Sequence, residues 1–323
     1  MAALAPALVA IVGPTASGKS ALALRLAREC SGEIVSCDSL QVYRGLDIGS
    51  AKATPEERAA VPHHLLDVAE PDAAFSAAEY ARLARSAIAE IRARGRLPIV
   101  AGGSGLYLRA LLEGLFEAPS RDDALRQRLE QLARRFSDRR LHRLLARVDP
   151  AAAAGINAND RVRIVRALEV YWLTGRPITA HRGAGSRPLE GFRTFLVGLA
   201  PDRARLRAAV ENRTRQMLER GLLEEARAVL AACGGAVPRP LAAIGYRQAV
   251  RVLRGELAAP EAERSIVTET MRLAKRQLTW FRHQAPRGVA WFATPDEAHA
   301  AVLEWLERLD QQHDPGLDRN RLP

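Results

Sequence analysis

Short apolar runs alternate with helical patterns along the first part of the chain. Four runs rich in Val, Ile, Leu and Phe are each followed by small or polar residues, at 8–12, 34–37, 97–101 and 195–200. Residues 19–30 and 76–94 repeat apolar side chains at helical spacing, and Ser76 with Glu79 forms a helix-capping pattern. Runs that are apolar throughout are typical of strands buried on both faces of a parallel sheet. The pattern therefore predicts an α/β fold, a parallel sheet flanked by helices.

The middle of the chain has only helical patterns. Apolar residues recur at helical spacing in three segments, at 122–135, 138–147 and 160–173. The pattern breaks at Asp149-Pro150 and around Pro177, and a strand-like run returns at 192–200. We therefore expect an all-helical insertion domain that interrupts the α/β core.

These patterns divide the chain into four parts. The expected parts are a first piece of the core at 1–120, the helical insertion at 121–190, a second piece of the core at 191–310 and a tail at 311–323. The second piece is mostly helical, with a short strand at 288–292 and a helix at 295–309. The tail is polar, and we expect it to be disordered.

Charge is unevenly distributed among these parts. The chain has 48 Lys and Arg against 37 Asp and Glu, a formal net charge of +11. Residues 121–201 contain 16 basic and 8 acidic side chains, and residues 202–287 contain 17 and 9, so these two segments carry the whole surplus. Clustered basic residues are typical of a surface that binds a polyanion, because phosphates release their counterions on binding. A solvated helical surface rich in arginine gives the same count, so charge alone leaves both interpretations open.

Several classes of protein are disfavoured by the composition. No apolar run approaches the roughly 18 to 20 residues of a membrane span. Because a Gly-rich motif begins at Gly13, we expect no signal peptide and a soluble, cytoplasmic protein. Cys30, Cys37 and Cys233 lack the spacing of metal ligands or of a disulfide framework, so we expect reduced thiols. His63-His64 also has no partner at metal spacing, and we expect a structural role for it.

The strongest motif follows the first predicted strand and precedes the first predicted helix. It fits the phosphate-loop pattern G-x-x-x-x-G-K-[ST] and consists of Gly13, Pro14, Thr15, Ala16, Ser17, Gly18, Lys19 and Ser20. The backbone N–H groups of such a loop cradle phosphates, while the lysine reaches them and the hydroxyl of Ser20 can bind Mg²⁺. The motif predicts a polyphosphate site, without specifying a nucleotide.

A carboxylate is expected beside this loop. Asp38 directly follows the strand at 34–37, and Asp67 follows Leu65-Leu66. Functional groups in α/β sheets lie at the carboxyl ends of strands, which favours Asp38. A helix cap or an outer-sphere ligand of Mg²⁺ would also place an aspartate here. Residues 38–52 form a long polar stretch with glycines, which indicates a substrate-facing loop.

Further motifs extend the phosphate loop into a pattern that covers most of the chain. They are residues 38–52 (DSLQVYRGLDIGSAK), 62–67 (PHHLLD), 102–107 (GGSGLY), Asn159-Asp160 with Arg163, 166–169 (RALE), 244–248 (IGYRQ) and 272–282 (RLAKRQLTWFR). In these motifs, and in their order, the sequence resembles the tRNA dimethylallyltransferases, also called tRNA isopentenyl transferases. It has Ser20 and Ser104 where that family usually has threonine, and both positions keep the hydroxyl.

The resemblance implies a specific reaction. A dimethylallyl group moves from dimethylallyl diphosphate to the exocyclic amine of the adenine just 3′ of the anticodon in tRNA, and diphosphate is released. The phosphate loop would hold the diphosphate, with Lys19 and Mg²⁺ offsetting the charge that grows on the leaving group. Asp38 would take the proton of the amine, with Ser104 and Arg213 in the same catalytic site. By spacing alone, Arg207 and Arg215 are rivals of Arg213.

The resemblance also implies that both basic segments contact the anticodon stem-loop of tRNA. Arg and Lys hold RNA phosphates, and a base that leaves its stack is received by aromatic or guanidinium planes. The implied tRNA-binding residues are Asp38, Ser39, Leu40, Gln41, Ser104, Arg126, Arg163, Arg166, Gly245, Tyr246, Arg247, Lys275, Arg276, Gln277, Thr279 and Arg282. We expect neither a membrane nor an obligate protein partner.

Other functions explain fewer of these features. A phosphate-loop kinase of small molecules accounts for the loop and Asp38 but gives no reason for the basic segments. A non-catalytic or ATP-driven RNA-binding protein accounts for the charge but not for the loop at 38–52. A prenyltransferase of free adenine nucleotides would not need two separate basic surfaces. The sequence therefore favours prenyl transfer to tRNA.

Overall fold

The protein folds as two compact units. The structure, a computed structural model, describes residues 5–115, 119, 122–181, 187–286 and 288–312, so the predicted tail lies outside the described residues from 313 onward. The first unit comprises Met1–Leu112 and Leu189–Pro323, and the second comprises Glu113–Pro188. The two ends of the first unit that flank the second are joined, because the N–H of Leu189 donates to the C=O of Leu112 at 3.0 Å.

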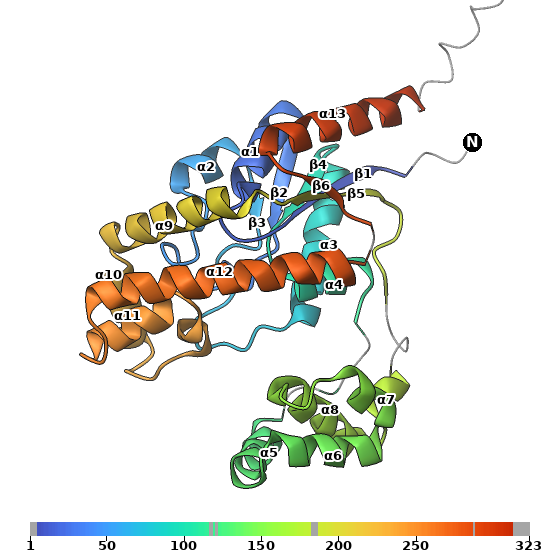
Figure 1. Cartoon of the computed structure of the whole chain (residues 1–323). Coiled ribbons are helices and arrows are strands. Elements are labelled where there is room, and N and C mark those ends of the chain that lie inside the picture. Colours follow the sequence, from blue (N-terminus) through green and yellow to red (C-terminus); the bar gives the residue numbers. More distant parts are fainter. Residues whose placement is uncertain (1–4, 116–118, 120–121, 182–186, 287, 313–323) are drawn as a thin grey trace, which may run out of the picture. The chain divides into compact units, whose positions relative to one another are not determined.

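A six-stranded sheet lies at the centre of the first unit (Figure 1). Its strands are β1 (Ala7–Val12), β2 (Gly32–Ser36), β3 (His63–His64), β4 (Leu97–Ala101), β5 (Arg193–Leu199) and β6 (Ala290–Phe292). They are arranged in the order β3-β2-β4-β1-β5-β6, and every neighbouring pair is parallel. The predicted α/β fold with a parallel sheet is therefore confirmed. The sequence pattern missed β3, which is too short to produce an apolar run.

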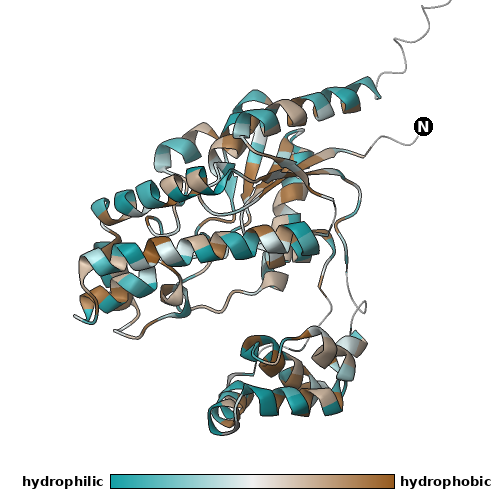
Figure 2. Cartoon of the chain, in the orientation of Figure 1, coloured by the Kyte–Doolittle hydropathy of each residue, from teal (hydrophilic) through white to brown (hydrophobic). Residues whose placement is uncertain are grey.

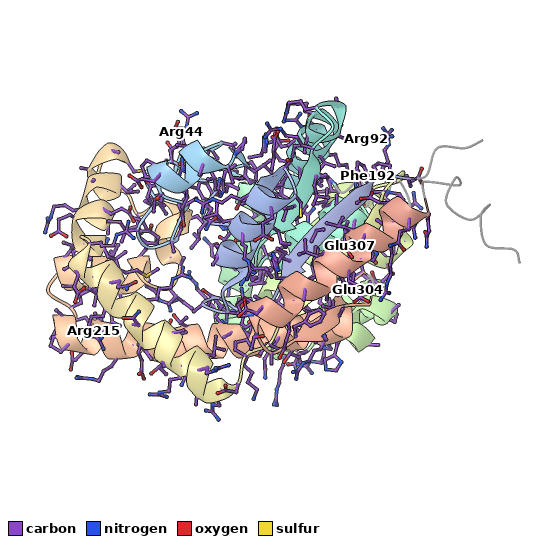
Figure 3. The ribbon with its side chains drawn as sticks, turned by 90° about the horizontal axis from the view of Figure 1, so that it is seen from above. Arg44, Arg92, Phe192, Arg215, Glu304 and Glu307 are labelled. Carbon is purple, nitrogen blue, oxygen red and sulfur yellow. The ribbon has the colours of Figure 1, made fainter. Side chains whose placement is uncertain are left out.

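Helices pack around this sheet and extend beyond it. Those of the first unit are α1 (Lys19–Glu29), α2 (Pro55–Ala60), α3 (Ala77–Ala93), α4 (Gly105–Leu112), α9 (Arg203–Glu219), α10 (Leu222–Ala232), α11 (Tyr246–Leu253), α12 (Ala259–Gln284) and α13 (Pro295–Gln311), with a short 3₁₀ helix at Arg239–Ala242. The predicted capping of α3 is present, because Ser76 Oγ accepts the N–H of Glu79 at 3.1 Å. On the edge of the unit, Arg92 of α3 lies over the ring of Phe192 (Figure 3).

Strand β1 is apolar along its whole length because helices cover both faces of the sheet. Alternate residues of β1 point in opposite directions. One buried cluster contains Leu8, Ala10 and Val12 together with residues of α3, α4 and α9 to α12. A second buried cluster contains Val9 and Ile11 together with residues of α1 and α13. Figure 2 shows the result as apolar strands enclosed by helices that carry hydrophilic residues. Burial on both faces is the condition that the sequence pattern predicted.

Three adjacent strands lead the predicted site residues to one edge of the sheet. Ser36 of β2 lies opposite Ala101 of β4, and β4 also pairs with β1. Because all three strands are parallel, the segments that follow them leave the sheet at the same edge. Gly13 therefore emerges beside Asp38 and Ser104.

The second unit is helical over its described residues. It contains α5 (Asp123–Phe136), α6 (Asp138–Val148), α7 (Pro150–Gly155), α8 (Arg161–Thr174) and a 3₁₀ helix at Ile178–His181. Its buried core includes Leu129, Leu145 and Ile164. The predicted break at Asp149-Pro150 is the start of α7, since Asp149 Oδ1 accepts the N–H of Ala152 at 2.9 Å and Pro150 occupies the first turn.

Three further expectations concern thiols, metals and membranes. Cys30, Cys37 and Cys233 are free thiols. Over the described residues, no group of three or more His, Cys, Asp or Glu side chains could hold a metal ion. In the same part of the chain, no helix is both long and apolar enough to cross a membrane.

Candidate active site

The phosphate loop connects β1 to α1 and requires glycine at its first position. Gly13 has a φ of +139°, and a Cβ atom there would lie 2.5 Å from the carbonyl oxygen of Leu199. Gly18 also has a left-handed conformation and immediately precedes Lys19, where α1 begins. The loop therefore passes close to β5 and presents the N-terminus of α1, with its unpaired N–H groups, at the carboxyl edge of the sheet.

Lys19 lies inside this loop and donates to the carbonyl oxygen of Pro14. Burial and, to a smaller extent, the charge of Arg213 lower the pKa of its ammonium group, Asp38 partly opposes them, and the resulting pKa is about 7. Burial also lowers the pKa of Arg213, while Asp38 raises it. Two half-buried basic side chains therefore face one carboxylate, an arrangement that an anionic ligand would stabilise.

This pKa predicts that Lys19 takes up a proton when a diphosphate ligand binds. At about pH 8, well above a pKa of about 7, Lys19 is mostly neutral in the free protein, and a bound anion favours its charged form. Calorimetric titration with inorganic diphosphate in two buffers of different ionisation enthalpy measures the uptake. Lys19→Arg, which stays charged at this pH, should remove the part due to the lysine. Equal uptake by the wild type and Lys19→Arg would contradict the assignment.

A cavity of about 430 Å³ opens in front of the loop. Its lining includes residues 15–20 of the loop together with Asp38, Gln41, Arg213 and Gln277. Within the described structure, the hydroxyl of Ser17 is buried and has no hydrogen-bond partner. Because buried polar groups are almost always paired in folded proteins, a ligand atom in the cavity would supply the partner that this hydroxyl lacks.

Asp38 and Ser104 lie on neighbouring loops at the carboxyl edge of the sheet. Asp38 Oδ1 accepts the N–H of Leu40 at 2.8 Å, so the residue caps its own turn. Among the described residues, none donates a hydrogen bond to its Oδ2, which leaves this oxygen available as a proton acceptor. Ser104 Oγ accepts the N–H of Ser39 at 3.0 Å and thereby joins the two loops. Asp67, the other carboxylate considered, is instead paired with Lys52 and Arg58.

Three arginines of α9 were candidates for the site, Arg207, Arg213 and Arg215, and only Arg213 of these three lines the cavity. Its guanidinium donates to Thr15 Oγ1 at 3.1 Å and to the Ser50 carbonyl at 3.4 Å. Arg207 pairs with Glu211 at 2.8 Å on the exposed side of α9, and Arg215, labelled in Figure 3, is also exposed. The fold therefore separates three arginines that spacing alone could not.

Gln277 has a role that the sequence analysis did not foresee. It comes from α12, yet its Oε1 accepts the N–H of Thr15 at 2.9 Å and its Nε2 donates to the carbonyl of Gly103 at 3.1 Å. Gln277 thus connects the phosphate loop to the segment before Ser104. Gln216 and Arg220 of α9 also line the cavity and were not predicted, because their helix carries many similar polar residues.

The implied tRNA-binding residues of the first unit fall into exposed and buried groups. Lys275, Arg276, Thr279 and Arg282 are exposed along α12, and all but Arg276 line a groove of about 590 Å³ between α9 and α12. Arg247 is exposed and paired with Glu269. Gly245 and Tyr246 are buried.

Tyr246 is fully buried, and its hydroxyl donates to Glu225 Oε1 at 2.6 Å. Its ring is therefore not presented for stacking on a base in this structure. The sequence identified an aromatic residue after a glycine but could not show that the ring points inward.

The implied tRNA-binding residues of the second unit also differ from one another. Arg126 and Arg166 both bind the buried carboxylate of Glu169, which in addition accepts the N–H of Asp122 at 2.9 Å. Arg163 is exposed and makes a 3.3 Å ion pair with Asp160. The charges of Arg126 and Arg166 are thus partly neutralised within the unit, whereas that of Arg163 lies at the surface.

The fold and the cavity together define a class of protein. It is an α/β protein of the phosphate-loop type, in which two half-buried basic side chains and one carboxylate face the loop at the carboxyl edge of a parallel sheet.

Comparisons with known proteins define the family within this class. The model of the IPP transferase family matches residues 41–284. The chain is 52% identical to a tRNA dimethylallyltransferase from Anaeromyxobacter sp. (strain K), over 93% of this chain and 97% of the relative. It is also 52% identical to the tRNA dimethylallyltransferase of Solibacter usitatus (strain Ellin6076), over 86% and 90%.

A solved structure agrees with these relatives. The full-length tRNA isopentenylpyrophosphate transferase from Bacillus halodurans is similar with a TM-score of 0.66 and 39% identity, covering 95% of this chain and 99% of that one. The chain therefore belongs to the tRNA dimethylallyltransferase family.

Proposed function

We propose that the protein transfers a dimethylallyl group from dimethylallyl diphosphate to the exocyclic amine of the adenine just 3′ of the anticodon in tRNA. The observation that carries this proposal is the meeting of the phosphate loop, Asp38 and Arg213 around one cavity, in a chain that belongs to this family. Because the proposed substrate is tRNA, we expect the reaction to take place in the cytoplasm.

The reaction exchanges one bond for another. The bond between the allylic carbon and the diphosphate oxygen breaks as a bond from the adenine nitrogen to that carbon forms. Lys19, Arg213 and the loop N–H groups stabilise the charge that develops on the departing diphosphate. Asp38 accepts the proton that the amine loses, and Ser104 fixes the Asp38 loop to the segment that follows β4.

Mg²⁺ fits the oxygen donors of the cavity. The hydroxyl of Ser20 is exposed to the cavity and would hold the ion. Magnesium in proteins often binds one or two oxygen side chains and takes its remaining ligands from water and substrate phosphates. When bound, the ion would offset the negative charge of the diphosphate.

Labelled substrate tests the proposed function directly. The protein is incubated with radiolabelled dimethylallyl diphosphate and either total tRNA or free ATP. Label in tRNA is the expected result. Label in the free nucleotide would support the nucleotide prenyltransferase instead, and label in neither would refute prenyl transfer.

We also predict negligible ATP hydrolysis, although the loop has the sequence of a nucleotide-binding motif. The carboxylate beside the phosphate loop is Asp38, which lies on a loop that also carries proposed tRNA contacts. In the proposed function it accepts a proton from the tRNA amine and does not position a water molecule for attack on ATP. Phosphate release from ATP measures the activity. Steady release that is abolished by Lys19→Ala would favour a kinase or an ATPase over the transferase.

Exposed basic residues should hold tRNA through its phosphates. Reversing Arg163 or Lys275 to glutamate should weaken tRNA binding and make the plot of log Kd against log salt less steep, by about 0.7 to 0.9 per lost phosphate contact. Binding of inorganic diphosphate should not change, because neither side chain lines the phosphate cavity.

Arg82→Glu provides the matched control for this series. Arg82 is an exposed arginine of α3 that pairs with Glu79 and lies outside both basic segments. Binding that is insensitive to salt, or equally weakened by all three reversals, would mean that the basic surplus is only a solvated surface.

A further inference from the structure

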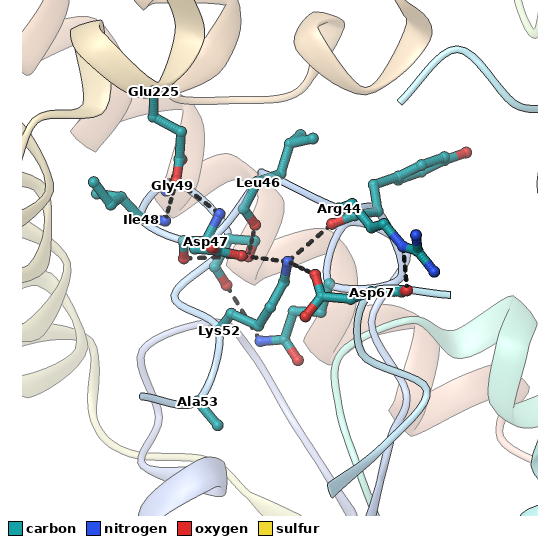
Figure 4. A network of polar contacts seen from close by, with 12 residues as sticks. Arg44, Leu46, Asp47, Ile48, Gly49, Lys52, Ala53, Asp67 and Glu225 are labelled. Atoms are coloured by element: carbon teal, nitrogen blue, oxygen red, sulfur yellow. Dashed lines mark hydrogen bonds and ion pairs between the residues drawn. The ribbon is translucent and has the colours of Figure 1, made fainter. Parts of the chain in front are cut away.

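One carboxylate of α10 holds the loop that follows Asp47. Glu225 Oε2 accepts the N–H groups of Asp47 and Ile48, each at 2.8 Å, and Oε1 accepts that of Gly49 at 3.1 Å (Figure 4). Successive backbone N–H groups that converge on one point form a nest, a geometry that binds anions. Here the anion is a side chain of the same protein.

Tyr246 completes the set of donors to Glu225. Its hydroxyl donates to Oε1 at 2.6 Å, so this carboxylate accepts four hydrogen bonds. The ring packs against Gly49, where an added Cβ atom would lie 2.5 Å from the ring carbon that carries the hydroxyl. Helix α10, helix α11 and the loop are therefore fixed to one another at a single point.

The other end of this loop reaches the phosphate cavity. The carbonyl of Ser50 accepts from Arg213 at 3.4 Å and from Gln41 Nε2 at 3.3 Å, and the carbonyl of Ala51 accepts from Gln41 at 3.2 Å. Arg213 in turn donates to Thr15 of the phosphate loop. The position of the Ser50 carbonyl therefore affects Gln41 and Arg213, which both line the cavity.

A second buried group closes the same loop from the opposite side. The Lys52 side chain has no exposed surface and donates to the Tyr43 carbonyl at 2.8 Å, to Asp67 at 2.7 Å and to Asp47 (Figure 4). Lys52 therefore maintains the fold of the loop without Glu225. Loss of Glu225 should shift the loop rather than unfold it.

We propose that Glu225 is a positioning residue, which sets the place of the Ser50 carbonyl and through it the orientation of Arg213. This proposal depends on the proposed function in one respect only, namely that the cavity binds a diphosphate. Misplacement by about 1 Å of a group that orients a substrate can cost on the order of 10²-fold in rate, so an effect of this size is expected from a residue outside the cavity.

The test compares Glu225→Gln with Glu224→Gln. Glutamine keeps one acceptor but turns N–H groups toward the backbone donors, whereas Glu224 is the exposed neighbour on the same helix turn. Calorimetry with inorganic diphosphate should show about tenfold weaker binding for Glu225→Gln. The kcat/KM for prenyl transfer should fall by about 10- to 100-fold, and Glu224→Gln should match the wild type in both measurements.

A double-mutant cycle with Arg213→Ala separates positioning from general destabilisation. If Glu225 acts through Arg213, Glu225→Gln should change diphosphate binding by less than about twofold once the arginine is gone. A loss that persists in full in that background would overturn the proposal. So would wild-type diphosphate binding by Glu225→Gln.

Two further results keep the test decisive. If Glu225→Gln does not fold, Tyr246→Phe removes one of the four donors and keeps the ring, and it should weaken diphosphate binding by about threefold; unchanged binding would overturn the proposal. A wild-type protein that binds diphosphate but transfers no prenyl group would refute the proposed function and leave the role of Glu225 intact.

Discussion

Replacing Asp38 with alanine should lower the rate of prenyl transfer in a single turnover by about 10²- to 10⁴-fold, the usual range for a positioned acid–base group. Asp38 follows β2 at the carboxyl edge of the sheet, and its Oδ2 is free of hydrogen bonds from the described residues. Binding of tRNA should change little. Quench-flow measurement with labelled dimethylallyl diphosphate and saturating enzyme isolates the chemical step.

Asp38→Asn distinguishes the two roles that this side chain can have. The amide oxygen can still accept the N–H of Leu40 and cap the turn, but the amide cannot take a proton at neutral pH. A fall in rate as large as that of Asp38→Ala would assign the effect to proton transfer. Transfer by Asp38→Asn at nearly the wild-type rate would assign it to the turn and remove Asp38 as the base.

The second large effect concerns the stability of the helical unit. Arg166→Glu would place a new carboxylate beside Glu169, whose side chain has no exposed surface, and should destabilise the unit by about 3 to 5 kcal/mol, as expected when a buried ion pair is broken. Hydrogen exchange of α8 in the full chain measures this change. Arg163→Glu, three residues earlier and exposed, should leave the protection of α8 almost unchanged.

The same carboxylate makes the unit sensitive to acid. Burial raises the pKa of Glu169, but the hydrogen bonds from Arg126 and Arg166 outweigh it and lower the pKa to about 2. A lowered pKa contributes stability above the ordinary value of 4.5, and this contribution is lost as the pH falls from there toward 2. Protection of α8 that does not decrease over this range would contradict the role of Glu169.

The sequence predicted the fold well because the signals for strands are local. A strand buried on both faces is rich in apolar residues, and the apolar runs within β1, β4 and β5 have this composition. The phosphate loop is local for the same reason, since its glycines and Lys19 act within one turn of chain. The two-residue β3 left no such signal.

The remainder of the site depends on contacts between distant residues. Gln277 is 262 positions from Thr15, and Glu225 is 178 positions from Asp47. No spacing along the chain indicates such pairs. The direction of a side chain was equally hard to predict from the sequence. Tyr246 and Arg166 are residue types that often bind RNA, but each faces a carboxylate within its own unit.

The hydrogen bond between Leu112 and Leu189 has a consequence for how this protein can change. The chain leaves the α/β unit and returns to it at one point. The helical segment therefore acts as a closed loop inserted into the α/β unit. The entropy of closing a loop grows only with the logarithm of its length, about 0.6 kcal/mol for each doubling. Segments of quite different length can therefore occupy this position at a similar entropic cost to the α/β unit, which allows the helical unit to diversify while the phosphate loop is kept.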